Sequence, residues 1–284
     1  MIQLGLTGYP LGHSLSPKLH AAAFQSVGLD GEYRLYPVSP DEPAGLAGLL
    51  GRVRSGELLG LNVTIPHKQT VIPLLDELTP SAQGIGAVNT VYLKDGKLIG
   101  HNTDAPGFTV DLRRSLGQQT AGRVLVLGAG GAARAVVYAL LTNGWDVTMA
   151  VRRADVEMAQ ALSASFERQS ANGAPRFVLL EAALLRPLLQ DIQLLVNTTP
   201  LGMSPAIDAS PWPENLEFPQ AAVYDVVYNP RETLFVRQAR AAGLRAETGL
   251  GMLVAQAALS FETWTGRAPA IDAMFEAVGM GRAE

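Results

Sequence analysis

Polar side chains occur in four short segments of the first third of the chain: GHSLSP (12–17), NVTIPHK (62–68), GAVNT (86–90) and HNTD (101–104). Together they supply hydroxyls, amides, one lysine and one aspartate, which are the groups that a polyhydroxylated acid requires for binding. A site that gives each substrate hydroxyl a partner also rejects analogues that lack it. Each segment has a structural alternative as well: serines before Pro17 can cap a helix, Asn-Thr pairs suit turns, and Lys68 can be a solvated charge.

A glycine-rich segment in the middle of the chain has the composition of a dinucleotide-binding turn. The sequence GAGGAA at 128–133 follows an apolar run and opens a helix-like stretch, which gives the pattern G-x-G-x-x-A in its expected context. In such turns the pyrophosphate approaches the backbone, and N–H groups at the helix N-terminus face the phosphates. A glycine-rich turn without a ligand is the alternative. The residues expected to bind cofactor here are Gly128, Ala129, Gly130, Gly131 and Ala132.

The end of the next predicted strand indicates which dinucleotide is bound. An NAD site usually places Asp or Glu about 20 residues beyond the glycines to bind the ribose hydroxyls. Here the strand ends in Ala150-Val151-Arg152-Arg153, without an acid. Two guanidinium groups suit a 2′-phosphate, so the sequence favours NADP. The alternative is that Arg152 and Arg153 only solvate the start of a helix.

The elements that must position these residues alternate along the chain. In the first third, short apolar runs alternate with helix-like stretches, which favours βαβ units. Further on, continuous apolar runs at 124–128, 194–199 and 223–228 are typical of parallel strands covered on both faces. We therefore predict an α/β protein with two lobes, a Rossmann-like NADP-binding domain and an α/β substrate domain.

The length of 284 residues suggests about two domains, with a cleft between them. An apolar-rich helix pattern at 252–265 follows the second domain with no strand after it, so we expect it to fold back on the first domain and complete it. The predicted substrate-binding catalytic domain is 1–105 with 249–284, and the predicted Rossmann domain is 106–248.

Composition excludes several functional classes. A net charge of -4 offers no positive field for nucleic acid. The absence of cysteine excludes disulfides, thiolate metal sites and a cysteine nucleophile. No signal-like start and no run of about 18 apolar residues is present, so we expect a cytoplasmic protein without a membrane partner. Four histidines lack metal-ligand spacing and are alternative acid–base candidates, although His67 is expected to shape its loop: His13, His20, His67 and His101.

Eight ordered motifs together resemble one known family. They are GHSLSPKLH, NVTIPHK, GAVNT, NTDAPGF, GAGGAAR, NTTPLGM, DVVYNPRET and GLGMLVAQAA, and they extend from about Gly8 to Trp264. This series resembles the shikimate dehydrogenase family. The resemblance implies reversible NADP-dependent reduction of 3-dehydroshikimate to shikimate, in the pathway to aromatic amino acids, by a monomer or homodimer.

The resemblance also implies roles for individual residues. Lys68 and Asp104 match the catalytic pair, which would carry the proton that accompanies hydride transfer. The matching substrate contacts are Ser14, Ser16, Thr64, Asn89, Tyr228 and Gln256. Residues around the cofactor's ribose and nicotinamide match Asn197, Thr198 and Met203, and those at the 2′-phosphate match Arg152, with Arg153 beside it. Asn62 is expected to brace the loop that carries Lys68. One departure is Val151, where the family commonly has asparagine.

Two other functions compete with this interpretation. Quinate/shikimate dehydrogenase using NAD shares most motifs, but quinate-preferring relatives tend to carry threonine at the position of Ser16, and the cofactor strand lacks an acid. A non-catalytic dinucleotide-binding regulatory module would have the same fold. The presence of both Lys68 and Asp104, together with the serines, argues against it.

Overall fold

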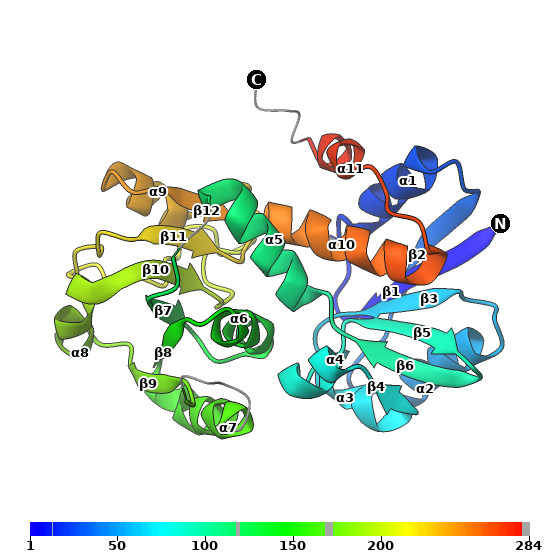
Figure 1. Ribbon diagram of the computed structural model, residues 1–284, viewed down its shortest axis with the longest axis horizontal. Helices are drawn as coiled ribbons and strands as arrows, with labels where there is room; N and C mark the ends of the chain where they lie inside the picture. Colours follow the sequence, from blue (N-terminus) through cyan, green and yellow to red (C-terminus); the bar gives the residue numbers. More distant parts are fainter. Residues whose placement is uncertain (13, 118–119, 168–172, 280–284) are drawn as a thin grey trace. The chain divides into compact units, whose positions relative to one another are not determined.

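The computed structural model describes residues 1–12, 14–117, 120–167 and 173–279, so His13 lies outside the described residues. The chain divides into two compact units (Figure 1). We call Met1–Gly107 with Val254–Glu284 the split unit and Phe108–Leu253 the central unit. Both boundaries fall inside helices, α5 (Asp104–Leu116) and α10 (Leu250–Thr265).

The split unit is built on a six-stranded mixed sheet with the order β2-β1-β3-β5-β6-β4. β1 pairs in parallel with both β2 and β3, as the alternating pattern of the sequence predicts. Its strands are β1 (Ile2–Gly8), β2 (Gly31–Pro37), β3 (Gly60–Val63), β4 (Glu77–Leu78), β5 (Thr90–Lys94) and β6 (Lys97–His101). Its other helices are α1 (Ser16–Ser26), α2 (Pro43–Arg54), α3 (His67–Thr70), η1 (Ile72–Leu74), α4 (Pro80–Ile85) and α11 (Ile271–Ala277).

β5 interrupts the parallel pattern, which the alternation in the sequence does not predict, and β4 pairs in parallel with β6 beyond it. β3 pairs with β5, and β5 with β6, in antiparallel fashion. The turn between β5 and β6 is Asp95-Gly96, with φ of 49° and 76°. Two successive positive φ values are what a tight hairpin turn requires, and Asp-Gly is a preferred pair for it. After this hairpin, β6 ends at His101, and Asn102, Thr103 and Asp104 follow directly.

The central unit is a doubly wound parallel sheet with the order β12-β11-β10-β7-β8-β9. The predicted apolar runs form its middle strands, and residues 124–127 of β7 are wholly buried because helices cover both faces. Its strands are β7 (Arg123–Leu127), β8 (Asp146–Val151), β9 (Arg176–Leu179), β10 (Ile192–Asn197), β11 (Ala222–Asp225) and β12 (Ala246–Thr248). Its helices are α6 (Gly131–Thr142), η2 (Arg153–Asp155), α7 (Val156–Phe166), α8 (Ala182–Leu185), η3 (Arg186–Asp191) and α9 (Leu234–Ala241).

Strand order reverses between β7 and β10 of the central unit. Chain progression runs outward from β7 through β8 to β9, and then from β10 through β11 to β12 on the other side. In open α/β sheets, ligands bind outside the carboxyl ends of the strands at such a reversal. Gly128 follows β7 and Asn197 ends β10, so both lie at this place.

The second half of α10 packs on the sheet of the split unit. The Trp264 indole N–H donates a hydrogen bond to the Val91 carbonyl oxygen at 3.1 Å. A Cβ added at Gly60 would lie 2.1 Å from the Trp264 ring, so glycine is needed where the ring crosses β3. Phe261 and Ser260 of the same helix are fully buried.

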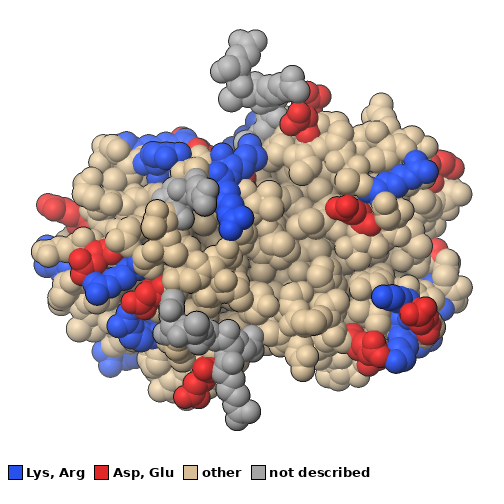
Figure 2. All heavy atoms as spheres, in the orientation of Figure 1, with Lys and Arg blue, Asp and Glu red and all other residues tan. Residues whose placement is uncertain are grey.

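Charges of both signs are mixed on the face that Figure 2 shows, rather than separated by sign. On the face that Figure 2 shows, blue Lys and Arg side chains are interspersed with red Asp and Glu side chains. Among the described residues, no helix is long and apolar enough to cross a membrane. In the same part of the chain, no group of three or more His, Asp or Glu side chains is placed to hold a metal ion.

Candidate active site

Lys68 and Asp104 form an ion pair in the split unit. The Lys68 Nζ lies 2.7 Å from Asp104 Oδ2, and the two side chains are 19% and 12% exposed. Lys68 lies on α3, which follows the carboxyl end of β3, and Asp104 is the first residue of α5. A carboxylate in the first turn of a helix is stabilised by the positive end of the helix dipole. The structure therefore brings together, from separate elements, the two residues that the sequence assigns to proton transfer.

Asn89 connects this pair to Gln256. Its Nδ2 donates to Asp104 Oδ1 at 2.9 Å and lies 3.4 Å from Gln256 Oε1. Because Asp104 Oδ1 is occupied by the amide and Oδ2 by the lysine, the carboxylate is held in one orientation. Asn89 and Gln256 were both predicted to bind substrate, and both lie beside the ion pair.

Ser14 and Ser16 lie at the start of α1, after the carboxyl end of β1. Ser14 Oγ accepts a hydrogen bond from the Ser16 backbone N–H at 3.3 Å, and the N-cap position itself is Leu15, which has no capping side chain. Neither serine therefore caps α1, although Ser14 stabilises the turn that precedes the helix. Thr64, at the end of β3, is half-buried, and its backbone N–H donates to the Thr7 carbonyl.

The described histidines are placed as structural residues. His67 is buried, with Nε2 2.7 Å from the Val38 carbonyl oxygen, as its expected loop-shaping role requires. His101 Nδ1 lies 2.9 Å from the Thr79 hydroxyl, and burial lowers its pKa. His20 is fully buried and stacks on Tyr33 with ring centroids 4.0 Å apart. Burial lowers the pKa of His20 to about 3, which the Asn62 side chain partly opposes.

The glycine-rich turn of the central unit leaves space for a ligand. Gly128 has φ of 98°, a conformation that glycine adopts without strain, and Gly130 is the N-cap of α6. A Cβ at Gly130 or Gly131 would meet no atom within 4 Å, so this end of α6 is open. A Cβ at Gly128 would lie 2.9 Å from the Thr199 side chain. The open helix N-terminus fits a pyrophosphate, as the motif predicts.

Asn197 and Thr198 turn their side chains into the central unit. Asn197 is fully buried: its Nδ2 donates to Asp225 Oδ1 at 2.8 Å, and its Oδ1 accepts from the Thr199 backbone N–H at 2.9 Å. The Thr198 hydroxyl donates to the Leu127 carbonyl at 2.7 Å. A cofactor at this loop would therefore meet backbone atoms or the exposed Met203 side chain rather than these two polar groups. Their assignment to cofactor binding stays a prediction.

Asp225 is a functional candidate that the sequence analysis missed. It is wholly buried at the end of β11 and accepts hydrogen bonds from Asn197, the Val227 backbone and Thr233. Burial raises its pKa to about 6 despite these three donors. Its position at the start of DVVYNPRET, directly after an apolar run, is the available sequence signal.

Arg152 and Arg153 lie at the carboxyl end of β8 and already have acidic partners. Arg152 makes two hydrogen bonds to Asp155, at 2.7 and 3.2 Å, and Arg153 lies 3.2 Å from Glu181. Their side chains are 70% and 80% exposed, so each can reach a ligand. A 2′-phosphate here would compete with Asp155 for the Arg152 guanidinium.

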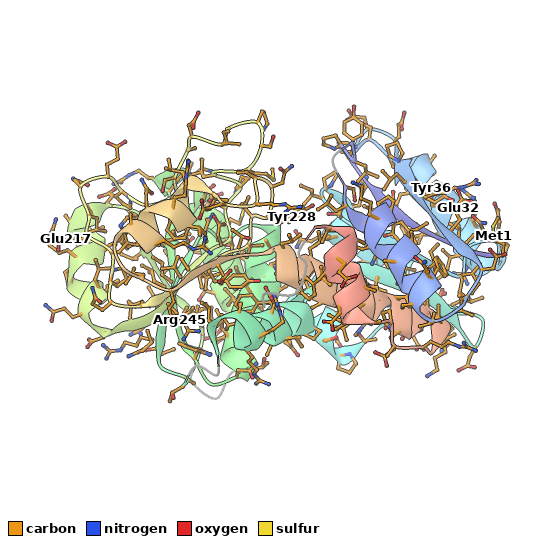
Figure 3. All side chains as sticks on the ribbon, turned by 90° about the horizontal axis from the view of Figure 1, so that it is seen from above. Met1, Glu32, Tyr36, Glu217, Tyr228 and Arg245 are labelled. Carbon is orange, nitrogen blue, oxygen red and sulfur yellow. The ribbon has the colours of Figure 1, made fainter. Side chains whose placement is uncertain are left out.

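Tyr228 (Figure 3) lies three residues after β11, and burial raises the pKa of its hydroxyl.

Three hydroxyls lie close to Asn89 or to one another beside it. Those of Thr90 and Thr103 belong to the polar segments 86–90 and 101–104 singled out in the sequence, whereas that of Ser260 was missed. The signal for Ser260 is its spacing of four residues from Gln256 on a helix that is otherwise largely apolar.

The geometry above defines a class: a two-domain α/β protein with a Rossmann-like dinucleotide-binding sheet and a lysine–aspartate pair in the other unit. Family models assign it more narrowly. The model of the shikimate dehydrogenase substrate binding domain matches residues 6–91, and that of the shikimate 5′-dehydrogenase C-terminal domain matches residues 249–278. The chain belongs to the shikimate dehydrogenase family. The resemblance found in the sequence motifs is confirmed.

Individual relatives cover nearly the whole chain. A shikimate dehydrogenase (NADP(+)) of Geobacillus kaustophilus is 41% identical over 277 residues, which is 96% of this chain and 96% of the relative. The crystal structure of the Thermus thermophilus shikimate 5-dehydrogenase in complex with NADP(H) and shikimate matches with a TM-score of 0.83 and 41% identity, over 98% of both chains. Quinate dehydrogenase from Corynebacterium glutamicum in complex with NAD matches with a TM-score of 0.86 and 35% identity, over 98% of both chains.

Proposed function

We propose that this chain catalyses the reversible, NADP-dependent reduction of 3-dehydroshikimate to shikimate. The observation that carries the proposal is the ion pair of Lys68 and Asp104, 2.7 Å apart and steadied by Asn89, in a member of the shikimate dehydrogenase family. Relatives named as NADP-dependent shikimate dehydrogenases, about as long as this chain, support the substrate and the cofactor.

In this proposal, Lys68 and Asp104 carry the proton at the substrate oxygen. Reduction of a ketone adds a proton to the oxygen while hydride is added to the carbon, and oxidation reverses both. Bound NADP(H) supplies or accepts the hydride. The Lys68 ammonium has a short hydrogen bond to Asp104, so the pair offers one positioned proton that can move to or from the substrate. Ser14, Ser16, Thr64 and Gln256 supply hydroxyls and an amide for the substrate's polar groups, whereas the side-chain amide of Asn89 is bonded to Thr90, Thr103 and Asp104.

The central unit fits NADP in two places. The open end of α6 beyond Gly130 and Gly131 presents backbone N–H groups to a pyrophosphate. The exposed guanidinium groups of Arg152 and Arg153 suit a 2′-phosphate, which forms strong charge-assisted hydrogen bonds with arginine. No carboxylate ends β8 in the position that would favour an NAD ribose.

One observation favours a second candidate, an NAD-dependent enzyme acting on quinate as well as shikimate. Asp155 already pairs with Arg152, and Val151 has no polar side chain to add, so the expected 2′-phosphate site is weaker than two arginines alone suggest. The similarity to the Corynebacterium quinate dehydrogenase keeps this candidate in the test.

The experiment is a matrix of initial rates. Shikimate and quinate are each oxidised with NADP and with NAD, and the reduced nicotinamide is followed by absorbance. The proposal expects kcat/KM to be highest for shikimate with NADP. A higher value for quinate with NAD would replace the first function by the second, and no turnover in any of the four combinations would leave a binding module.

A further inference from the structure

Behind Asn89, three buried hydroxyls meet at one point of the split unit. Ser260 Oγ lies 2.9 Å from Thr90 Oγ1 and 3.1 Å from Thr103 Oγ1. All three residues have no exposed surface. They come from β5, from the turn before α5 and from α10, which are far apart in sequence. We call Thr90, Thr103 and Ser260 the hydroxyl cluster.

Each hydroxyl of the cluster has a single proton to donate, which limits the directions of its hydrogen bonds. Ser260 donates to the Gln256 carbonyl at 3.0 Å, so it accepts from Thr103. Thr90 donates to Asn89 Oδ1 at 2.9 Å, so the Thr90 and Ser260 oxygens are neighbours without a proton between them. Thr103 Oγ1 accepts from Asn89 Nδ2 at 2.9 Å, which leaves its proton for Ser260.

The Thr90 and Thr103 hydroxyls, the Thr103 backbone N–H and Asp104 together determine how the Asn89 amide is turned. Its oxygen receives the Thr90 hydroxyl and the Thr103 backbone N–H at 2.8 Å, so its nitrogen faces Thr103 Oγ1 and Asp104 Oδ1. With the amide reversed, two oxygens would oppose each other at Asp104, and a backbone N–H would face an NH₂ group. Leaving buried polar groups without partners is strongly unfavourable.

Asn62 anchors the cluster from the opposite side. Its Nδ2 donates to Ser260 Oγ at 3.0 Å and to the Asn89 carbonyl at 2.9 Å, and it lies 3.2 Å from Thr90 Oγ1. Its Oδ1 accepts the Tyr33 hydroxyl at 2.8 Å. Burial raises the pKa of Tyr33, so this hydroxyl keeps its proton and acts as a fixed donor. An unbroken series of hydrogen bonds therefore leads from Tyr33 to the Lys68–Asp104 pair.

We propose that Ser260, acting with Thr90 and Thr103, is a positioning residue for the acid–base pair: it fixes the orientation of the Asn89 amide, which in turn holds Asp104 toward Lys68. The inference rests on the proposed function. It differs from a purely structural role, in which the hydroxyls only satisfy one another where α10 crosses the sheet, because it assigns them an effect on catalysis through Asn89.

A matched pair of substitutions on α10 tests the proposal. Ser260→Ala removes a hydroxyl that belongs to the cluster. Thr263→Ala removes an exposed hydroxyl of the same helix that makes the same kind of bond, to the carbonyl four residues earlier (Leu259, 2.8 Å), without touching the cluster. We expect kcat for shikimate oxidation to fall roughly 10- to 100-fold in Ser260→Ala, as misplacement of a catalytic group does. The KM for NADP should stay within about twofold in both variants, and Thr263→Ala should keep the parent kcat.

A second variant covers the case in which Ser260→Ala fails to fold. Thr103→Val keeps the side-chain shape and removes the hydroxyl that accepts from Asn89, so it should lower kcat in the same way at an unchanged KM for NADP. The proposal is overturned if both variants fold and keep kcat within about twofold of the parent. If Ser260→Ala does not fold, the same result for Thr103→Val alone overturns it.

A measurement without turnover separates this inference from the proposed function. In the parent, the Asn89 side-chain NH₂ protons should exchange slowly with solvent by NMR, and in Ser260→Ala or Thr103→Val they should exchange faster. Unchanged exchange would show that the cluster does not orient the amide. A parent that orients Asn89 but does not turn over shikimate would overturn the proposed function and the catalytic part of this inference together.

Discussion

Asn89 and Asp104 in the split unit are buried and hydrogen-bonded to neighbouring side chains, whereas Arg152 and Arg153 in the central unit extend into solvent. In the first region, polar side chains from four elements constrain one another. In the second, the glycine turn is open, and each of the two exposed cations is paired with a carboxylate.

This difference suits the two roles that we propose for these regions, proton transfer and recognition of a phosphate. Proton transfer requires a fixed distance between donor and acceptor, and a preorganised pair provides it before the substrate arrives. Recognition of a phosphate requires charge and reach, and an exposed arginine exchanges its partner at small cost because surface ion pairs contribute little. Substitutions in the split unit should therefore change catalysis, and those at the end of β8 should change cofactor choice.

The largest effect is expected for Lys68→Met. The methionine keeps the length of the side chain and removes the proton carrier, so kcat should fall roughly 10²- to 10⁴-fold while the fold and ligand binding change little. Steady-state rates and circular dichroism measure the two. Lys94→Met, at an exposed lysine of β5, is the control. Near-normal turnover in folded Lys68→Met would exclude the lysine and return attention to a histidine.

Acid stability should differ between the two units because burial shifts the pKa of His20 in the split unit down and that of Asp225 in the central unit up. The pKa of His20 is lowered from 6.5 to about 3, so below pH 6.5 the unfolded chain binds a proton that the folded split unit does not, and stability falls. The pKa of Asp225 is raised from 3.8 to about 6, so between pH 6 and 4 the folded central unit binds the proton first, and stability rises as the pH falls.

Single substitutions separate these opposing effects. His20→Met should remove an acid-induced loss on the order of 2 kcal/mol at pH 5. Asp225→Asn should remove the opposing gain and make the loss of stability steeper. Melting temperatures between pH 4 and 7 measure both, with Asp208→Asn at an exposed carboxylate as the control. A His20→Met curve parallel to that of the parent would contradict the assignment.

A smaller effect is expected at the cofactor end. If Arg152 binds the 2′-phosphate, Arg152→Ala should lower the ratio of kcat/KM for NADP to that for NAD by roughly 10- to 150-fold. Arg176→Ala, another exposed arginine with an acidic partner at the same sheet, should leave the ratio unchanged. A ratio that survives removal of both Arg152 and Arg153 would mean that selectivity arises elsewhere.

The smallest expected effect is a gain in kcat/KM for NADP rather than a loss. Asp155→Asn frees the Arg152 guanidinium and removes a negative charge near the expected phosphate, so kcat/KM for NADP should rise about two- to fivefold and that for NAD should not. The gain should shrink as salt is added, because exposed charges are screened. An equal gain with both cofactors would place the effect outside the 2′-phosphate.

The sequence predicted the central unit more fully than the split unit, for physical reasons. Buried parallel strands are long apolar runs, and a glycine turn is a local feature, so β7, α6 and β8 could be located from neighbouring residues. In the split unit, the Asp95-Gly96 hairpin was overlooked although its signal is local. The contact between Ser260 and Thr90 joins residues 170 positions apart, and no local pattern reports it. Lys68 and Asp104 were assigned through the family motifs, because neither spacing nor composition brings them together.

The split unit includes residues 254–284, which the ribosome adds only after the whole central unit has been made. Until then, β3 and β5 lack the Trp264 ring that covers Gly60 and binds the Val91 carbonyl, and the Thr90 hydroxyl lacks Ser260. The central unit is continuous in sequence and can collapse as it emerges, since domains generally fold as units during synthesis. Completion of the split unit therefore requires the last part of the chain: β3 and β5 are joined by a helix made more than 150 residues later.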